Sequence, residues 1–339
     1  MTAPIRKGRF APTPSGRMHL GNALSALLAW LQMRSCGGRI ALRLEDLDRA
    51  RCKPEYAPLL LEDMAWLGLD WDEGPDAGGP CGPYRQSDRT EWYEQALRRL
   101  EEQHLLYPCY CSRADLRMAA GAPHGLASEG PAYPGTCRQL TAEERAQKEA
   151  SGKTPSLRFR MPWRTVRFRD GVAGPQEFPP PAGGDFVVKR ADGIIAYQLA
   201  VVVDDIAMGI TDVFRGRDLL DSTPRQIALY EALGSEPPAF AHGPLLIGPD
   251  GARLSKRHGA VSLAELRERG VTAEEIAGFL AWHAGLLDRP EPVKPRDLVP
   301  QFRPDLVPRT DIVLSAEELQ RLADGTWPGN RRRVHGTAN

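Results

Sequence analysis

The chain has 339 residues, 42% of them hydrophobic, and its 44 Lys and Arg residues balance 44 Asp and Glu residues. This composition is typical of a globular protein of roughly two domains, and zero net charge argues against a uniformly basic nucleic-acid coat. The longest apolar runs, such as Ile194–Val203, are half the roughly 20 residues that a membrane helix needs, so we expect no transmembrane segment. The N-terminus lacks the apolar core of a signal peptide, which predicts a cytoplasmic location.

The first 70 residues predict alternating strands and helices. Arg6–Ala11 reads as a strand, and the helical spacing of apolar residues in His19–Arg34 predicts a helix after it. A second strand is expected over Arg39–Leu44, ending in the acidic run Glu45–Asp48, and a second helix over Pro54–Leu67. This order favours a parallel sheet with helices on both faces, where ligands bind at the carboxyl ends of the strands.

The middle of the chain is less regular. A charged helix is expected over Thr90–His104, followed by Tyr107–Leu140, whose Gly, Pro and Cys content indicates a small module without a core of its own. Alternation in Ser156–Arg169 predicts a strand with a basic outer face, and the apolar run Ile194–Asp205 predicts a strand buried on both faces.

The last part of the chain is predicted to be helical. Ser or Thr caps begin three expected helices, Ser262–Arg269, Thr272–Gly285 and Ser315–Asp324. The basic tail that contains Arg331–Arg333 is expected to be disordered, with its charge serving solubility or weak RNA contact.

Two Gly-containing motifs indicate phosphate chemistry. Arg9–Asn22 joins the first strand to the first helix, whose N-terminal amide groups can bind phosphate, with His19 as a further donor. Leu246–Gly259 is a Gly turn followed by a basic loop, where Lys256 is placed to neutralise a departing phosphate. Alone, His19 could be a simple helix cap and the basic loop could be solvated, but the two motifs together favour a nucleotide site.

These motifs carry a resemblance to a known family. His19-Leu-Gly-Asn22 resembles the HIGH motif of class I aminoacyl-tRNA synthetases, and Arg253-Leu-Ser-Lys-Arg257 resembles their KMSKS loop. Asn22, Arg253 and Arg257 depart from the family pattern, whereas Ser255 and Lys256 retain it. Between Gly8 and Gly285, stretches such as RFAPTPSG and LRLEDLD resemble the glutamyl-tRNA synthetase subgroup.

The resemblance implies a fold and a domain order. The expected fold class is α/β, with the Rossmann-type parallel sheet of a class I synthetase, helices on both faces, an inserted zinc-binding module and a small helical C-terminal segment. The expected parts are residues 1–106, the first half of the catalytic domain; 107–140, the zinc-binding module; 141–190, the rest of an inserted region like an acceptor-binding region; 191–260, the second half of the catalytic domain; 261–325, the helical segment; and 326–339, the tail.

The resemblance also implies residue roles in ATP binding. The implied ATP-binding residues are His19, Gly21, Asn22, Ser255 and Lys256. His19 and Lys256 would be catalytic, because they would stabilise the departing pyrophosphate together with Mg²⁺.

Glutamate carries two carboxylates and an ammonium, so its site needs at least one Arg and one acid. By resemblance, Arg9 and Arg215 would hold carboxylates and Glu45 would face the α-ammonium. Thr13 and Tyr197 would complete the pocket by hydrogen bonding. As structural alternatives, Arg215 could pair with Asp218 on the surface and Glu45 could cap the following helix. Val201 stands where the glutamyl enzymes commonly have Asn.

Three cysteines form a further candidate site, for a metal ion. Cys109, Cys111 and Cys137 could hold one structural Zn²⁺, which needs a fourth ligand. Residue type alone favours His124, because imidazole is a common zinc ligand. The arrangement instead resembles glutamyl-Q tRNA(Asp) synthetases, a family of short glutamyl-tRNA synthetase paralogues, and this implies Tyr133. Reduced cysteines without a metal are the alternative, and Cys36, Cys52 and Cys81 have no assigned role.

The expected reaction follows from this resemblance. Only about 80 residues follow the KMSKS-like loop, too few for a separate anticodon-reading domain. The resemblance implies that ATP activates L-glutamate, which is then esterified to queuosine in the anticodon loop of tRNA(Asp) by a chain expected to be monomeric. The alternatives are a truncated glutamyl-tRNA synthetase that charges the 3′ end of tRNA(Glu), and a non-catalytic zinc-containing RNA-binding paralogue. Expected RNA contacts are Arg158, Arg160, Arg164 and Arg167.

Overall fold

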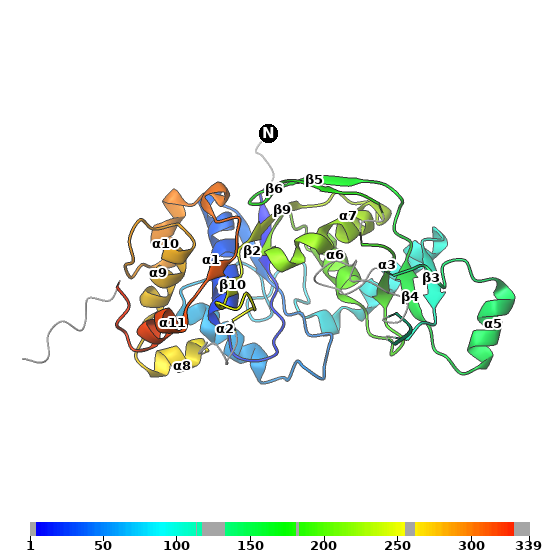
Figure 1. Ribbon diagram of the computed structural model, residues 1–339, viewed down its shortest axis with the longest axis horizontal. Coiled ribbons are helices and arrows are strands. Elements are labelled where there is room, and N and C mark those ends of the chain that lie inside the picture. The colour runs from blue at the N-terminus through cyan, green and yellow to red at the C-terminus, as the bar shows by residue number, and fades with distance from the viewer. Residues whose placement is uncertain (1–4, 113, 117–132, 181–182, 255–261, 329–339) are drawn as a thin grey trace, which may run out of the picture.

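The computed structural model describes residues 5–112, 114–116, 133–180, 183–254 and 262–328. A parallel four-stranded sheet in the order β2-β1-β8-β9 lies at its centre (Figure 1). Its strands are β1 (Lys7–Phe10), β2 (Arg39–Leu42), β8 (Asp212–Gly216) and β9 (Ala239–Gly243). Helix α1 (Leu20–Ser35) connects β1 to β2, as the sequence predicted.

Successive residues of the central strands point to opposite faces of the sheet, and each face is covered by helices. Ile40, Phe214 and Ala241 belong to the apolar cluster that contains α1 and the C-terminal helices. Their neighbours Ala41, Val213 and Phe240 belong to a second cluster on the other face. The predicted α/β class with helices on both faces is confirmed.

The first cluster joins α1 to α2 (Tyr56–Trp66) and to elements from the C-terminal part of the chain. The latter are α8 (Leu263–Glu268), α9 (Ala273–His283), α10 (Pro295–Leu298), α11 (Ala316–Ala323), η4 (Val299–Gln301) and the parallel pair β10 (Leu246–Ile247) and β11 (Ile312–Val313). The short helix η5 (Pro304–Leu306) lies between η4 and β11 in the chain. The predicted caps are confirmed at α8, α9 and α11. Ser262, Thr272 and Ser315 each accept a hydrogen bond from the backbone N–H of a Glu three residues later.

The second cluster contains α3 (Thr90–Glu102), α6 (Tyr197–Ala207) and α7 (Thr223–Ala232). The prediction of a strand over Ile194–Asp205 is wrong, because α6 occupies most of this range. The helix packs against α3 on one side and α7 on another, and every residue from Gln198 to Asp205 is buried. A helix buried on all sides has no polar stripe, and its sequence resembles that of a buried strand.

An inserted region contains the antiparallel sheet β3-β4-β7, formed by β3 (Leu106–Cys109), β4 (Ser156–Phe159) and β7 (Phe186–Lys189), and also α5 (Ala142–Ala150) and the hairpin β5 (Val166–Asp170) and β6 (Gly174–Phe178). The part around β3, β4 and α5 is on the right of Figure 1, and the hairpin lies along the top beside β9. The short helices η1 (Gln86–Asp88) and η2 (Arg217–Ser222) complete the described elements.

The single strand predicted over Ser156–Arg169 is two strands, because residues 160–165, which include Pro162, separate β4 from β5. The expected basic outer face is also wrong for β4. The side chain of Arg158 is only 6% exposed, and the strand therefore directs this cation inward.

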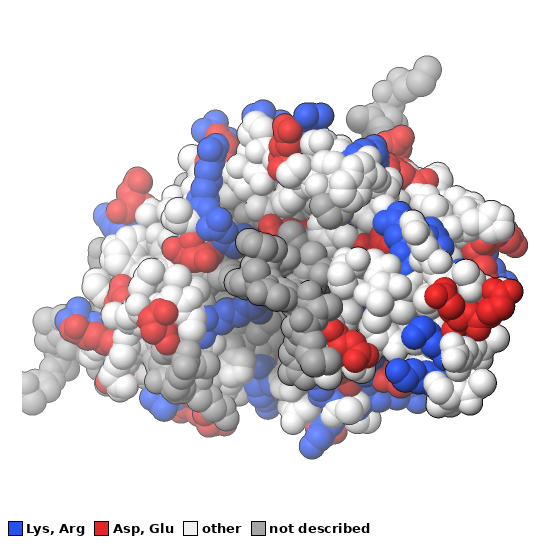
Figure 2. Space-filling model, turned by 45° about the vertical axis from the view of Figure 1, so that its right-hand side comes forward, with Lys and Arg blue, Asp and Glu red and all other residues white. Residues whose placement is uncertain are grey.

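The charge distribution on the surface and the hydropathy of the helices agree with the balanced charge and moderate hydrophobic content of the sequence. On the face shown in Figure 2, Lys and Arg side chains are interspersed with Asp and Glu side chains among the described residues. None of the helices in the described ranges has the length and apolar character needed to cross a bilayer.

We predict that Gly278→Ala destabilises the protein. A Cβ at this position of α9 would overlap the backbone carbonyl of Glu291 and lie 3.0 Å from Cα of Pro292. Relieving this overlap moves backbone, and we expect the free energy of unfolding to fall by about 1–3 kcal/mol. Urea denaturation measures the change. Gly21→Ala in α1 is the matched control, because a Cβ there meets nothing within 4 Å. Equal effects of the two variants would contradict the packing argument.

Candidate active site

The two phosphate motifs meet at one pocket beside the central sheet. His19, Gly21 and Asn22 from the start of α1 line a cavity of about 280 Å³ together with Arg253 and Leu254. The carboxyl end of β8 contributes Gly216, and Asp218 follows it. Residues far apart in the sequence therefore form a single pocket, as the combination of the two motifs predicted.

The start of α1 offers a free helix N-terminus to this pocket. His19 is the N-cap residue, its side chain is exposed, and it accepts no capping hydrogen bond from the helix amides. A Cβ at Gly21 would meet nothing within 4 Å, so the open space reaches the backbone of the first turn. Unpaired N–H groups and the helix dipole at such a terminus favour a bound phosphate.

The basic loop is described only in part. Arg253 is ion-paired with Asp218, and Leu254 packs against the cluster around α1. Ser255, Lys256 and Arg257 lie outside the described residues. The predicted roles of Ser255 and Lys256 in ATP binding therefore remain predictions.

Arg9, Glu45, Tyr197 and Arg215 converge near the carboxyl end of the sheet. Arg9 lies on β1, Glu45 follows β2, Arg215 lies on β8, and Tyr197 begins α6. Their mutual electrostatic influence shows that they are close, because both Arg9 and Glu45 affect the pKa of Tyr197. Thr13 lies in the turn before α1 and is exposed, and its backbone carbonyl accepts a hydrogen bond from Ser15.

Arg215 is held by neutral acceptors. Its Nε donates to Nε2 of His242 at 2.9 Å, Nη1 to Oε1 of Gln226 at 2.7 Å, and Nη2 to Oγ1 of Thr223 at 3.0 Å. Burial, reinforced by the charge of Arg9, lowers the pKa of Arg215 below its ordinary value. In the described part of the chain, no carboxylate forms an ion pair with this guanidinium. The alternative of a surface ion pair with Asp218 is therefore wrong, since Asp218 pairs with Arg253.

Arg9 is a second buried cation with little compensation. Its side chain is 5% exposed, and its Nε lies 3.5 Å from Asp205 but has no hydrogen-bond partner among the described residues. Two buried guanidinium groups without tight ion pairs make a site that favours an anionic ligand.

Glu45 provides the opposite charge at the edge of this site. One carboxylate oxygen, Oε1, accepts a hydrogen bond from Nη2 of Arg43 at 3.2 Å. Burial raises the pKa of Glu45 even though Arg43 and Arg9 oppose the shift. A bound ammonium group would favour the ionised carboxylate, which fits the role that the resemblance implies.

Asp204 and Asp205 at the end of α6 anchor this region, although no function was predicted for them. Asp204 accepts hydrogen bonds from Arg89, Gln86 and Tyr93, and its side chain is fully buried. Asp205 accepts a hydrogen bond from Nη1 of Arg43 at 2.6 Å. Two adjacent carboxylates at the end of an apolar run were the sequence signal that could have revealed this network, because buried acids require partners.

The three cysteines of the inserted region form a cluster suited to a metal ion. Their Sγ atoms all lie within 4.8 Å of one another, and Cys111 and Cys137 are 3.6 Å apart. The Tyr133 hydroxyl is 3.4 Å from Sγ of Cys109 and 4.0 Å from Sγ of Cys111. A tetrahedral ion with the usual bond lengths would separate sulfur ligands by about 3.8 Å and sulfur from oxygen by about 3.5 Å. The donor set fits such an ion, and His124 lies outside the described residues.

The environment of the cluster favours one thiolate above the others. Burial disfavours ionisation of Cys109, but hydrogen bonds from Tyr133 and Arg158 outweigh it and lower the pKa of Cys109. Burial and the neighbouring Cys109 raise the pKa of Cys111 to about 12. A cation among these atoms would remove the repulsion between the two sulfurs.

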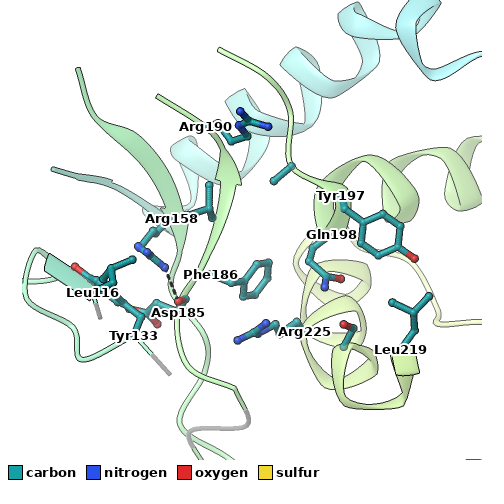
Figure 3. Close-up of a pocket in the computed structure, with 13 residues that line it drawn as sticks. Leu116, Tyr133, Arg158, Asp185, Phe186, Arg190, Tyr197, Gln198, Leu219 and Arg225 are labelled. Atoms are coloured by element: carbon teal, nitrogen blue, oxygen red, sulfur yellow. Dashed lines mark hydrogen bonds between the residues drawn. The ribbon is translucent and has the colours of Figure 1, made fainter. Parts of the chain in front are cut away.

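A second cavity, of about 540 Å³, lies between this cluster and the central domain. Figure 3 shows Tyr133 and Arg158 on one side of it and Tyr197, Gln198 and Arg225 on the other. The guanidinium of Arg158 stacks 3.8 Å from the centre of the Tyr133 ring. Burial lowers the pKa of Arg225 to about 10. Cationic and aromatic side chains around one cavity suit a nucleotide base with its phosphate.

The other predicted RNA contacts differ in their surroundings. Arg164 and Arg167 are exposed and ion-paired with Glu231 and Glu177. Arg160 lies over the ring of Tyr107 and donates to the backbone carbonyl of Arg138. Arg158 is thus the predicted contact that lines the second cavity.

Comparison with known proteins identifies similar chains. Residues 6–284 match the family model of the catalytic domain of class I tRNA synthetases (E and Q). The chain is 63% identical to a glutamyl-Q tRNA(Asp) synthetase of Symbiobacterium thermophilum and 51% identical to one of Nitratidesulfovibrio vulgaris. Each match covers 94% of this chain and 99% of the relative. The structure superposes on a glutamate-tRNA synthetase from Elizabethkingia anophelis with a TM-score of 0.80 at 28% identity, over 94% of this chain and 70% of the other.

We predict that Arg9→Met separates ligand binding from stability. The variant removes a buried cation that lacks a hydrogen bond at Nε, so the free energy of unfolding should hold or rise. The KM for glutamate in pyrophosphate exchange should increase about tenfold to a hundredfold, since an ionic hydrogen bond is lost.

Arg89→Met is the matched comparison for Arg9→Met, because Arg89 donates to Asp204 at 2.6 Å in the buried network. Its removal should lower the free energy of unfolding by about 3 kcal/mol. An unchanged KM for glutamate in Arg9→Met would contradict the assignment of Arg9.

Proposed function

Because the chain belongs to the class I tRNA synthetases (E and Q), and is thus a ligase of the aminoacyl-tRNA synthetase type, we propose that it transfers glutamate to queuosine. In this proposal ATP activates L-glutamate, and the glutamyl group is esterified to queuosine at the wobble position of tRNA(Asp). The observation that carries the proposal is a pair of cavities, one lined by the phosphate motifs with Asp218 and one lined by Tyr197 with Leu219, the next residue in the chain. Two relatives matched over 99% of their length bear the corresponding name.

The activation step suits the first cavity. The α-carboxylate of glutamate attacks the α-phosphorus of ATP, and pyrophosphate departs along the line of attack. The N-terminus of α1, with His19, Gly21 and Asn22, would bind the phosphates, and Ser255 and Lys256 would close on them from the basic loop. Mg²⁺ bound to ATP would neutralise part of the phosphate charge. Positioning and electrostatics carry the step, so it needs no nucleophile from the protein.

The glutamate would lie between the buried arginines and Glu45. Arg9 and Arg215 would bind its carboxylates, and Glu45 its ammonium group. Tyr197 and Thr13 would supply further hydrogen bonds. L-Glutamate carries a net charge of about −1 at neutral pH, as a ligand for incompletely compensated cations should.

The second cavity would receive the acceptor base. It adjoins Tyr197, so a hydroxyl of a base held there could reach an activated carboxyl group at the glutamate site. A base in an anticodon loop can turn outward without the melting of a duplex. Arg158, Arg190 and Arg225 line the cavity and would bind the RNA backbone beside the base.

The cysteine cluster would hold one structural Zn²⁺. The proposed ligands are Cys109, Cys111, Tyr133 and Cys137, whose separations match a tetrahedral site. The ion would fix Tyr133, and through it one wall of the second cavity. We further propose that the protein acts as a monomer.

One experiment tests the acceptor. The protein is incubated with ATP, labelled glutamate and tRNA(Asp) that carries either queuosine or guanosine at the wobble position, each with and without the 3′-terminal adenosine. The label should require queuosine and should survive loss of the terminal adenosine, because the expected ester forms on the base.

The alternative reactions give different results when parallel incubations contain tRNA(Glu) in place of tRNA(Asp). A truncated glutamyl-tRNA synthetase would require the terminal adenosine and tRNA(Glu). A non-catalytic RNA-binding paralogue would incorporate no label and would show no pyrophosphate exchange. Either outcome would overturn the proposal.

Metal analysis tests the zinc site. We expect one zinc per chain in the purified protein, and Cys111→Ser should lower the zinc content, since it replaces one of three clustered sulfurs. Removal of the metal by a strong chelator should lower the melting temperature. Cys81→Ser is the control, because Cys81 lies outside the cluster. Wild-type protein with far less than one zinc per chain would exclude the site.

A further inference from the structure

The feature that extends the proposed function is a buried chain of hydrogen bonds behind Arg215. Asp170 ends β5 in the inserted hairpin, His242 lies on β9, and Arg215 lies on the neighbouring strand β8. All three side chains are at most 5% exposed. The hairpin is fixed to the central sheet at this point, because the N–H of Gly171 donates to the carbonyl of Phe240.

The Asp170 carboxylate has one orientation in this environment. Its Oδ1 accepts hydrogen bonds from the backbone N–H groups of Val172, Ala173 and His242 at 2.9, 2.8 and 3.1 Å. Its Oδ2 lies 2.6 Å from Nδ1 of His242. The hydrogen bond from His242 and those from the backbone outweigh burial and lower the pKa of Asp170. The carboxylate is therefore ionised and can only accept hydrogen bonds.

An ionised Asp170 fixes the tautomer of His242. Since Oδ2 accepts from the ring, Nδ1 must carry the hydrogen, and Nε2 of a neutral ring has a lone pair. Burial lowers the pKa of His242 to about 4, with a further contribution from the charge of Arg215, so the ring is neutral near pH 7. The lone pair of Nε2 accepts the hydrogen bond from Nε of Arg215 at 2.9 Å.

The hydrogen bonds of Arg215 leave a donor for a ligand. Within the described residues, four of its five N–H groups are used: Nε by His242, one on Nη1 by Gln226, and both on Nη2 by Thr223 and by the carbonyl of Leu219. The remaining N–H on Nη1 belongs to a guanidinium that cannot rotate without breaking these bonds. The direction of this N–H is therefore set by the four acceptors that hold the guanidinium.

We propose that Asp170 and His242 are positioning residues that orient Arg215 for the glutamate carboxylate. The proposal rests on the proposed function, because it requires Arg215 to bind glutamate. It assigns a specific role in amino-acid binding to the inserted hairpin, where only an RNA contact, Arg167, was predicted. The residues act through Arg215, and neither needs to touch the substrate.

Two substitutions of His242 separate orientation from simple packing. His242→Asn can donate to Asp170 but has no acceptor at the position of Nε2. His242→Gln places its Oε1 near that position and can accept from Arg215. We expect His242→Asn to raise the KM for glutamate at least tenfold at nearly constant KM for ATP, and His242→Gln to restore most of the loss.

Asp170→Asn tests the tautomer directly. The three backbone donors should retain the amide oxygen at Oδ1, so the NH₂ group would face Nδ1 of His242. The ring would then carry its hydrogen on Nε2, opposite the N–H of Arg215. A single isosteric change should therefore raise the KM for glutamate as strongly as His242→Asn.

The double variant Asp170→Asn with His242→Gln completes a double-mutant cycle with the two single variants. It has no imidazole tautomer to reverse, so it should bind glutamate about as well as His242→Gln alone. Glu177→Gln on β6 is the surface control and should leave both KM values unchanged, because its partner Arg167 is exposed. Pyrophosphate exchange is measured for every variant with and without queuosine-containing tRNA(Asp), and melting temperatures report folding.

The outcomes distinguish failure of the proposed glutamate site from failure of the positioning role of Asp170 and His242. If Arg215→Lys and Arg215→Ala leave the KM for glutamate unchanged, the proposed glutamate site is wrong. If they raise it while folded His242→Asn and Asp170→Asn proteins behave as wild type, only the positioning role is overturned. Equal losses in His242→Asn and His242→Gln would also overturn it, because packing alone would then explain them.

Discussion

A surplus of buried positive charge dominates the centre of this protein. Four guanidinium groups, those of Arg9, Arg43, Arg89 and Arg215, lie with three carboxylates, those of Glu45, Asp204 and Asp205. A fourth carboxylate, that of Asp170, is separated from Arg215 by the neutral ring of His242 and does not contact any of the four arginines. Arg43 and Arg89 are paired closely with acids, and Arg9 and Arg215 are not. Uncompensated buried charge opposes folding, so these two arginines are explained best by a ligand. In the proposed function, a glutamate zwitterion with one extra carboxylate would supply the missing negative charge.

The fold places this surplus at a defined edge of the sheet. Parallel strands direct Arg9 and Arg215 toward the same end, and α6 brings Asp204 and Asp205 beneath them. The two aspartates hold Arg43 and Arg89, which leaves them little capacity to neutralise Arg215. The neutral contacts of Arg215 with His242, Gln226 and Thr223 fix its direction without cancelling its charge. Within one network, Arg43 and Arg89 thus contribute to stability, whereas Arg9 and Arg215 are the arginines proposed to bind the ligand.

Much of this arrangement could be predicted from local sequence. The strand, turn and helix around His19 have clear local signals, and the Ser and Thr caps mark the C-terminal helices. Helix α6 was predicted as a strand because its apolar residues surround it and leave no period to detect. Arg158 was predicted to lie on a basic outer face because alternation does not show what covers a strand. Asp170 and His242 are 72 residues apart, and nothing local connects them.

The same long-range contacts explain how an inserted region can serve two chemical steps. Its hairpin reaches the central sheet through Asp170 and supports the cation proposed to hold glutamate. Tyr133, which lies beside the cysteine cluster, lines the second cavity and stacks against Arg158. In the proposed function, a metal ion would therefore act on the acceptor side through Tyr133, and the hairpin on the glutamate side through Arg215. A disturbance of the cysteine cluster should affect the acceptor side first, because Arg215 is held by bonds that do not involve it.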